Sequence, residues 1–163
     1  MEYDSLSIIF NCLNKNGIII IHDYYDIIDF IIKYWKKKHI FTYNKELFDF
    51  QHKTINGYNF IISRSDTNEI NGILGFIPNS QYDDEITTLQ IWLALWKINT
   101  EKSTPGLGFL LIKYLEDNFN SNAITVNGVN NSVINLYKLM GYKTGVLNHF
   151  YFTNPFFIDF KIC

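Results

Sequence analysis

Residues 89–114 have the sequence LQIWLALWKINTEKSTPGLGFLLIKY, and this stretch decides the fold of the chain. Its first ten residues are almost all apolar or aromatic, which predicts a well-buried β-strand over residues 89–98. Polar residues and Pro105 then interrupt the pattern. From Gly106 onward the apolar residues recur every three or four positions, as on one face of a helix. The stretch therefore predicts a strand, a short loop and a helix in direct succession.

The loop brings the tripeptide Gly-Leu-Gly, residues 106–108, to the start of the predicted helix. Backbone N–H groups and the positive end of the helix dipole converge at such a place, which suits a phosphate group. A second interpretation is a simple strand-to-helix turn whose glycines only permit close packing. The tripeptide alone does not decide between these two interpretations.

The composition narrows the class of protein. The chain has 163 residues, enough for one domain with a substantial core, and a formal net charge of −2. A charge so close to balance argues against a nucleic-acid partner, which would usually be met by a basic stripe. The two cysteines, Cys12 and Cys163, lie near opposite ends and provide neither a disulfide framework nor a zinc site. We expect no bound metal.

The chain shows no pattern typical of a targeting signal. The N-terminus is acidic, with Glu2 and Asp4, and does not resemble a signal peptide. The longest apolar runs fall far short of the roughly 20 residues that a membrane-spanning helix needs. We therefore expect a cytoplasmic protein of a reducing compartment, without a membrane span.

The remaining segments alternate between helical and strand-like patterns. Helical spacing predicts helices over residues 5–16, from Asp23 to the lysines 36–38 with Ile32 and Trp35 inward, from Asn44, and from Asn131 or Ser132 to Gly141. Apolar and β-branched runs predict strands over residues 17–21, 58–63, 70–77, 123–126, 144–153 and 156–162. This order predicts one α+β domain, residues 1–163, on a mixed sheet.

Two segments of the chain resemble motifs of the GNAT acyl-CoA-dependent N-acyltransferases. The pyrophosphate loop of that family, Q/R-x-x-G-x-G/A, corresponds to residues 103–108. Its next motif, N-x-x-A-x-x-L-Y-x-x-x-G-F/Y, corresponds to Asn130, Val133, Leu136, Tyr137, Gly141 and Tyr142. The resemblance extends over nearly the whole chain. It implies a central mixed sheet of about six or seven strands, flanked by helices, with a splayed fourth strand.

The resemblance also implies acetyl-CoA as cofactor and a role for each matched residue. The backbone around Trp96 and Ile98 would bind the pantetheine arm, and Asn130 would contact the cofactor nearby. Tyr137 would lie at the thioester sulfur and protonate the leaving thiolate, a task that suits a phenol with an unperturbed pKa of about 10. The implied pyrophosphate ligands are the backbone N–H groups of Ser103, Thr104, Gly106, Leu107 and Gly108.

Two departures from the motif reduce the number of donors in the loop. Ser103 replaces the usual glutamine or arginine, and Pro105 has no backbone N–H. Lys102 is the residue that could compensate electrostatically.

Shorter phrases resemble a subgroup of GNAT-like proteins associated with lipopolysaccharide and glycan biosynthesis. They lie at residues 35–40, 46–51, 73–78, 91–97 and 147–149. By this analogy the acceptor is an amino sugar on a nucleotide. The alternative is a non-catalytic GNAT-like domain that holds acyl-CoA or docks on a partner. A homodimer is left open.

The predicted central strand contains no carboxylate that could deprotonate the acceptor amine. His149 is the first candidate base, because its unperturbed pKa of about 6.5 suits the task. Asp84 and Glu85, just before the strand, come second. His39, His52, Asp84, Glu85 and Trp92 are candidates for acceptor binding. Each has a plainer interpretation, since loop carboxylates are usually solvated and histidines and tryptophans often belong to the core.

Overall fold

A computed structural model of the chain describes residues 18–20, 23–55, 57–148 and 156. The chain forms two compact units, Met1–Gly128 and Val129–Cys163. The predicted helix over residues 5–16 and most of the predicted closing strands, residues 144–153 and 156–162, lie outside the described residues. The described residues 144–148 do not form a strand, so this part of the prediction is wrong.

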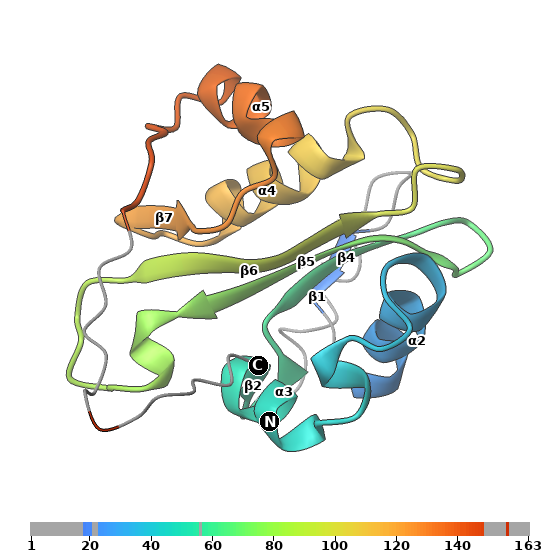
Figure 1. The fold of residues 1–163 in the computed structure, drawn as a ribbon, viewed down its shortest axis with the longest axis horizontal. Helices are drawn as coiled ribbons and strands as arrows, with labels where there is room; N and C mark the ends of the chain where they lie inside the picture. Colours follow the sequence, from blue (N-terminus) through green and yellow to red (C-terminus); the bar gives the residue numbers. More distant parts are fainter. Residues whose placement is uncertain (1–17, 21–22, 56, 149–155, 157–163) are drawn as a thin grey trace, which may run out of the picture. The chain divides into compact units, whose positions relative to one another are not determined.

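The first unit is built on a five-stranded mixed sheet (Figure 1). Its strands are, in spatial order, β1 (Ile18–Ile20), β4 (Phe60–Arg64), β5 (Ile70–Pro78), β6 (Gln90–Ile98) and β7 (Ala123–Val126). Neighbouring strands are antiparallel from β1 to β6, whereas β6 and β7 are parallel. A small hairpin joins β2 (Lys53–Thr54) to β3 (Gly57–Tyr58). The α+β mixed sheet is confirmed, with fewer strands in its described part than the six or seven expected.

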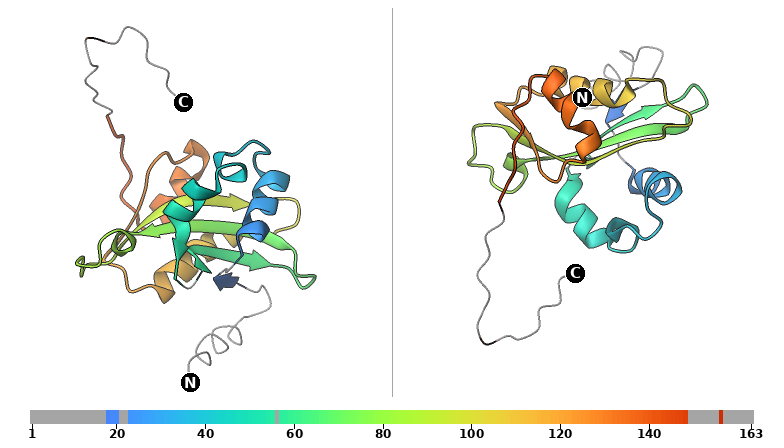
Figure 2. Two further views of the ribbon diagram at one scale, coloured as in Figure 1. Left: turned by 90° about the horizontal axis from the view of Figure 1, so that it is seen from below. Right: turned by 45° about the horizontal axis from the view of Figure 1, so that its top comes forward.

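Helices cover both faces of this sheet (Figure 2). On one face lie α2 (Tyr24–Tyr34) and α3 (Lys45–His52), joined by the short helix η1 (Ile40–Thr42). On the other lies α4 (Leu107–Asn118). A further short helix, η2 (Asn79–Gln81), follows β5. No helix in the described ranges is both long and apolar enough to cross a bilayer.

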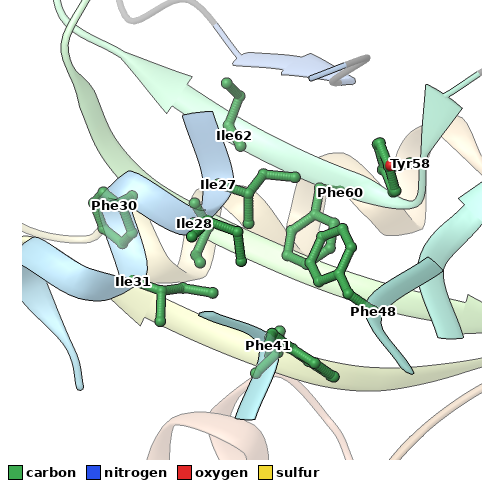
Figure 3. Packing of buried hydrophobic residues seen from close by; sticks show 11 residues of the cluster. Ile27, Ile28, Phe30, Ile31, Phe41, Phe48, Tyr58, Phe60 and Ile62 are labelled. Carbon is green, nitrogen blue, oxygen red and sulfur yellow. The ribbon is translucent and has the colours of Figure 1, made fainter. Parts of the chain in front are cut away.

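The core on the α2 side joins that helix and α3 to the sheet (Figure 3). Ile27, Phe30 and Ile31 of α2 pack with Phe48 of α3 and Phe60 of β4. All of these side chains are at most 3 % exposed, so burial of apolar surface is the main force that holds the layers together.

Two inward positions predicted for the second helix are wrong. Ile32 and Trp35 are 39 % and 40 % exposed, while Phe30 is buried. The helix ends at Tyr34 and Trp35 is its C-cap, so Trp35 no longer follows the helical face. Asp23 and Asn44 cap α2 and α3 as predicted, each accepting a backbone N–H through its side chain.

The strand β6 contains an irregularity that changes which way its side chains face. Phe76 of β5 pairs with Leu93, and the preceding Gly75 pairs with Leu95, which leaves Ala94 as an extra residue. Gly75 and Phe76 face opposite sides of the sheet because side chains alternate along a strand. Leu93 and Leu95 therefore face opposite layers, and Leu95 belongs to the core under α2 and α3.

The described part of the second unit contains the short helix η3 (Asn131–Val133) and α5 (Ile134–Leu139). Asn130 caps η3, because its Oδ1 accepts the N–H of Ser132 at 3.0 Å. The predicted cap at Asn131 or Ser132 was thus one or two residues late. Gly141 follows α5 with φ +86°, a conformation that favours glycine.

Candidate functional site

The edge of β6 that faces away from β5 is covered by β7 over only half its length. The pairing with β7 runs from Gln90 to Leu93, while the pairing with β5 continues to Ile98. Asn99 continues it by donating its N–H to the Asn71 carbonyl at 2.8 Å. Because backbone groups alternate in an antiparallel pair, those of Trp96 and Ile98 point away from β5. Beyond the extra residue Ala94, β6 thus continues to pair with β5 but no longer pairs with β7.

The loop between β6 and α4 is organised around Asn99. The Asn99 carbonyl accepts the N–H groups of Lys102 at 3.3 Å and Ser103 at 3.0 Å. Its side-chain Oδ1 accepts the N–H of Glu101 at 3.2 Å. The Asn99 side chain is 3 % exposed, so the base of this loop is part of the folded core.

The two glycines of the loop have different structural roles. Gly106 is the N-cap of α4 with φ +86°, and a β-carbon there would meet nothing within 4 Å. Gly108 packs on Trp96, because a β-carbon at Gly108 would lie 2.6 Å from the Trp96 ring. Close packing thus accounts for Gly108. A left-handed turn beside open space accounts for Gly106.

The first N–H groups of α4 have no partner within their own helix, as at every helix start. Leu107 donates to the Thr104 carbonyl at 3.2 Å and Ser103 donates to Asn99, so both groups are used inside the loop. Among the described residues, no hydrogen bond engages the N–H groups of Thr104, Gly106 or Gly108. Three donors at the positive end of a helix dipole, beside open space at Gly106, fit a phosphate or diphosphate group.

The lysine of this loop is engaged elsewhere. The Lys102 Nζ lies 2.6 Å from a carboxylate oxygen of Glu69, in the turn between β4 and β5. This hydrogen bond raises the pKa of Lys102 and lowers the pKa of Glu69. Both side chains are about half exposed, so the ion pair is a weak one that a bound anion could compete with.

The remaining residues of the two motifs, Asn130 and Tyr137, belong to the second unit. Tyr137 is 3 % exposed, and its ring packs edge-on against Tyr142 with 5.4 Å between the centroids. The Tyr142 N–H donates to the Tyr137 carbonyl at 2.9 Å. Burial raises the pKa of Tyr137, so its phenol keeps its proton at neutral pH.

Comparison with known proteins connects this geometry to a fold family. No protein-family model matches the chain, and no curated protein matches it. Solved structures do match. An aminoglycoside acetyltransferase from an uncultured soil metagenomic sample superposes with a TM-score of 0.62 at 18 % identity, over 86 % of this chain and 97 % of that one. The chain has the fold of the GNAT acetyltransferases.

A second solved structure has the same fold. The ribosomal-protein-alanine N-acetyltransferase of Brucella melitensis matches with a TM-score of 0.60 at 14 % identity, over 86 % of this chain and 100 % of that one. The chain spans only 59 % and 65 % of two further matched structures, with TM-scores of 0.45 and 0.46. At such identities the likeness concerns the GNAT fold alone.

The residues predicted to bind the acceptor lie in quite different environments. Trp92 is 48 % exposed on β6, and Asp84 and Glu85 are exposed on the loop before that strand. His39 is half-buried and caps η1, its Nδ1 accepting the N–H of Phe41 at 3.3 Å. The candidate base His149 lies outside the described residues.

His52 is a core residue, and its predicted contact with an acceptor is corrected. It has no exposed surface, and its ring packs against Phe41, Phe48 and Phe60 with centroids 4.7 to 5.7 Å apart. Burial lowers the pKa of His52 to about 4, because the charged form would lose its hydration. A neutral histidine enclosed by aromatic rings does not reach a substrate.

Two features of the structure are not foreseen from the sequence. The first is Asn99, whose position directly after a strand and before a polar loop is typical of a turn-forming asparagine. The second is the aromatic pair of Phe50 and Tyr82, which are 65 % and 51 % exposed with ring centroids 5.3 Å apart. Nothing in the local pattern distinguishes these two rings from core aromatics.

Proposed function

We propose that the chain is an acetyl-CoA-dependent N-acetyltransferase that acts on the amine of a small acceptor. The observation that carries the proposal is the set of unengaged N–H groups of Thr104, Gly106 and Gly108, where β6 gives way to α4. The open space beside Gly106 supports it, because a bound diphosphate needs room for close approach to the backbone.

Each part of the cofactor has proposed contacts on this chain. Thr104, Gly106 and Gly108 would hold the diphosphate. Contacts of Ser103 and Leu107 with the diphosphate remain predictions, because their N–H groups would first have to break their hydrogen bonds within the loop. The pantetheine arm would run along the β6 edge at Trp96 and Ile98, and Asn130 would contact it. Acetyl-CoA would supply the acetyl group as an activated thioester.

Proton transfer would fall to side chains of this chain. Tyr137 would protonate the departing thiolate, because its phenol carries a proton at pH 7 and burial raises its pKa further above neutrality. The acceptor amine must lose a proton before or during attack. His149 remains our proposed base, with Asp84 and Glu85 in second place.

We propose an amino sugar, carried on a nucleotide, as the acceptor. The exposed rings of Trp92, Phe50 and Tyr82 support a flat-faced acceptor of this kind, since aromatic faces pack well against the apolar face of a ring. A matched structure of the same fold is an aminoglycoside acetyltransferase, which is in keeping with an amine-bearing sugar.

Two measurements test the proposal in sequence. Titration calorimetry with acetyl-CoA should show saturable one-to-one binding, weakened by salt because the diphosphate is anionic. Release of free CoA thiol should then depend on an amino sugar from a panel that includes nucleotide-linked sugars, aminoglycosides and a basic peptide. The absence of acetyl-CoA binding would overturn the proposal. Turnover with the basic peptide but with none of the amino sugars would overturn the proposed amino-sugar acceptor.

The second candidate function is a non-catalytic domain that binds acyl-CoA or docks on a partner. The engagement of Lys102 by Glu69 and of two loop N–H groups within the loop favours it, because both reduce the donors that face a ligand. Binding of acetyl-CoA without turnover of any acceptor in the panel is the result that this alternative expects.

A further inference from the structure

Asn99 bonds to the loop that follows β6 through both its side chain and its backbone. Its side-chain Oδ1 accepts the N–H of Glu101 at 3.2 Å, and its backbone carbonyl accepts the N–H groups of Lys102 at 3.3 Å and Ser103 at 3.0 Å. It also donates its own N–H to Asn71 of β5 at 2.8 Å. A single buried residue therefore ties the loop both to itself and to the sheet.

We propose that Asn99 is a positioning residue for the diphosphate cradle. It holds residues 100–105 in the one shape that presents the N–H groups of Thr104, Gly106 and Gly108 to a ligand. This inference rests on the proposed binding of a CoA diphosphate. It goes beyond that proposal because Asn99 lies outside the matched motif and is too buried to touch the ligand itself.

The asparagine carries a cost that supports a specific role. Its Nδ2 is buried and has no hydrogen-bond partner among the described residues. A buried donor without a partner destabilises the folded chain, because it gives up its hydrogen bonds to water and gains none in return. An aspartate could accept the N–H of Glu101 without placing a donor in this buried position. An aspartate would, however, bury a negative charge beneath the cradle, whereas asparagine provides the acceptor without charge.

The function of the bonds would be to order the loop before the ligand arrives. Pro105 has no backbone N–H, and Ser103 stands where the matched motif has a glutamine or arginine. The loop therefore offers fewer hydrogen-bond donors to a diphosphate than the motif does. A loop that is already ordered loses less entropy on binding. The effect of Asn99 should therefore concern the diphosphate and leave the binding of pantetheine unchanged.

The test compares ligands that differ in the diphosphate. Acetyl-CoA and S-acetylpantetheine, which lacks the nucleotide and diphosphate, are titrated into the wild-type chain, Asn99→Ala, Asn99→Ser and Asn99→Asp. The matched control is Asn79→Ala, which removes a similar turn-forming asparagine whose Oδ1 accepts the N–H groups of Ser80 and Gln90 at the other end of β6. Thermal melts establish that each variant is folded.

Asn99→Ala removes the bond from the Glu101 N–H to Oδ1 and keeps the backbone bonds of residue 99, and it is expected to weaken acetyl-CoA binding by roughly five- to tenfold, the loss expected for one hydrogen bond that orders the loop. S-acetylpantetheine binding should change less than about twofold. Asn99→Ser should recover part of the affinity through its hydroxyl, and Asn79→Ala should bind acetyl-CoA like the wild type. Asn99→Asp should keep the conformation of the loop. It should bind acetyl-CoA more weakly than the wild type, and this deficit should be larger at low salt than at high salt.

Three results would overturn the inference. An Asn99→Ala chain that binds acetyl-CoA like the wild type removes the role of Asn99 and leaves the proposed function standing. Equal losses for both ligands show a general structural effect. A wild-type chain that binds S-acetylpantetheine but gains nothing from the diphosphate removes the cradle, and with it both proposals. Should Asn99→Ala not fold, the serine and aspartate variants decide between the same outcomes.

Discussion

Gly108 of α4 lies against the indole of Trp96 on β6 so closely that a β-carbon at Gly108 would be 2.6 Å from the ring. The contact fixes the start of the helix over the end of the strand, and thereby places the N–H groups of the loop. It also separates the two glycines of the loop by function, since Gly106 has open space around it.

The first prediction concerns this contact. Gly108→Ala forces the Trp96 ring to move, and overpacking of this kind costs about 1 to 3 kcal/mol of unfolding free energy. Urea denaturation measures the loss. Trp96→Phe removes the ring atoms that a β-carbon at Gly108 would meet, so the double variant should recover most of the loss that alanine adds. Simple additivity of the two substitutions would contradict the packing explanation.

The second prediction concerns the ion pair between Lys102 and Glu69. If the loop of residues 103–108 holds the diphosphate as proposed, Glu69→Gln should free the Lys102 ammonium to attract it and strengthen acetyl-CoA binding by about two- to fivefold, the range expected for an exposed charge. Calorimetry at two salt concentrations measures it, because the gain should shrink as ionic strength rises. In a Lys102→Met background the same substitution should have no effect, and a gain there would refute the mechanism.

The third prediction concerns the pH dependence of stability. The pKa of His52 is about 4 in the folded chain and about 6.5 when unfolded, so below pH 6.5 the unfolded chain binds the extra proton first. The contribution of neutral His52 to the free energy of unfolding is therefore fully present above pH 6.5, and it is lost as the pH falls towards 4. A shift of this size corresponds to about 3 kcal/mol.

His52→Phe provides the comparison for this prediction. Its unfolding free energy should exceed that of the wild type by an amount that grows between pH 6.5 and pH 4, because phenylalanine has no charge to gain. Urea denaturation at several pH values measures the difference. A constant difference between the two chains would show that His52 does not titrate in this window.

The fourth prediction concerns Tyr137. Tyr137→Phe should lower the rate of thiol release by roughly 100-fold or more, as expected for the loss of a general acid, with little change in the dissociation constant for acetyl-CoA. Tyr142→Phe is the matched control, because the two rings are in contact but only Tyr137 is proposed as the general acid. Unchanged turnover in Tyr137→Phe would remove its assignment as the acid.

Much of the fold follows from short-range pattern. The predicted strand over residues 89–98 and the helix after Gly106 appear as β6 and α4, and the predicted strands over residues 58–63 and 70–77 appear as β4 and β5. These elements were predictable because side-chain period, caps and turn residues act within a few positions of one another. The Asn44 cap of α3 is a clear example.

Other features depend on residues that are far apart in the chain. The extra residue at Ala94 exists only in register with β5, and the partner of Lys102 is 33 residues away in the turn between β4 and β5. The sequence around His52 is equally compatible with an exposed side chain. Its burial results from its packing against Phe41, Phe48 and Phe60 in the folded chain. Such contacts have no local signature, because any of several partners would satisfy the same side chain.

The sequence by itself thus determined the strand, the glycine loop and the helix, and with them the place of the proposed diphosphate cradle. The tertiary structure alone decided which N–H groups of the loop are already hydrogen-bonded, since Ser103 and Leu107 donate within the loop while Thr104, Gly106 and Gly108 have no acceptor in the described part of the chain. The physical reason is that secondary structure is set by neighbours along the chain. The direction of a donor is set by whatever folds against it.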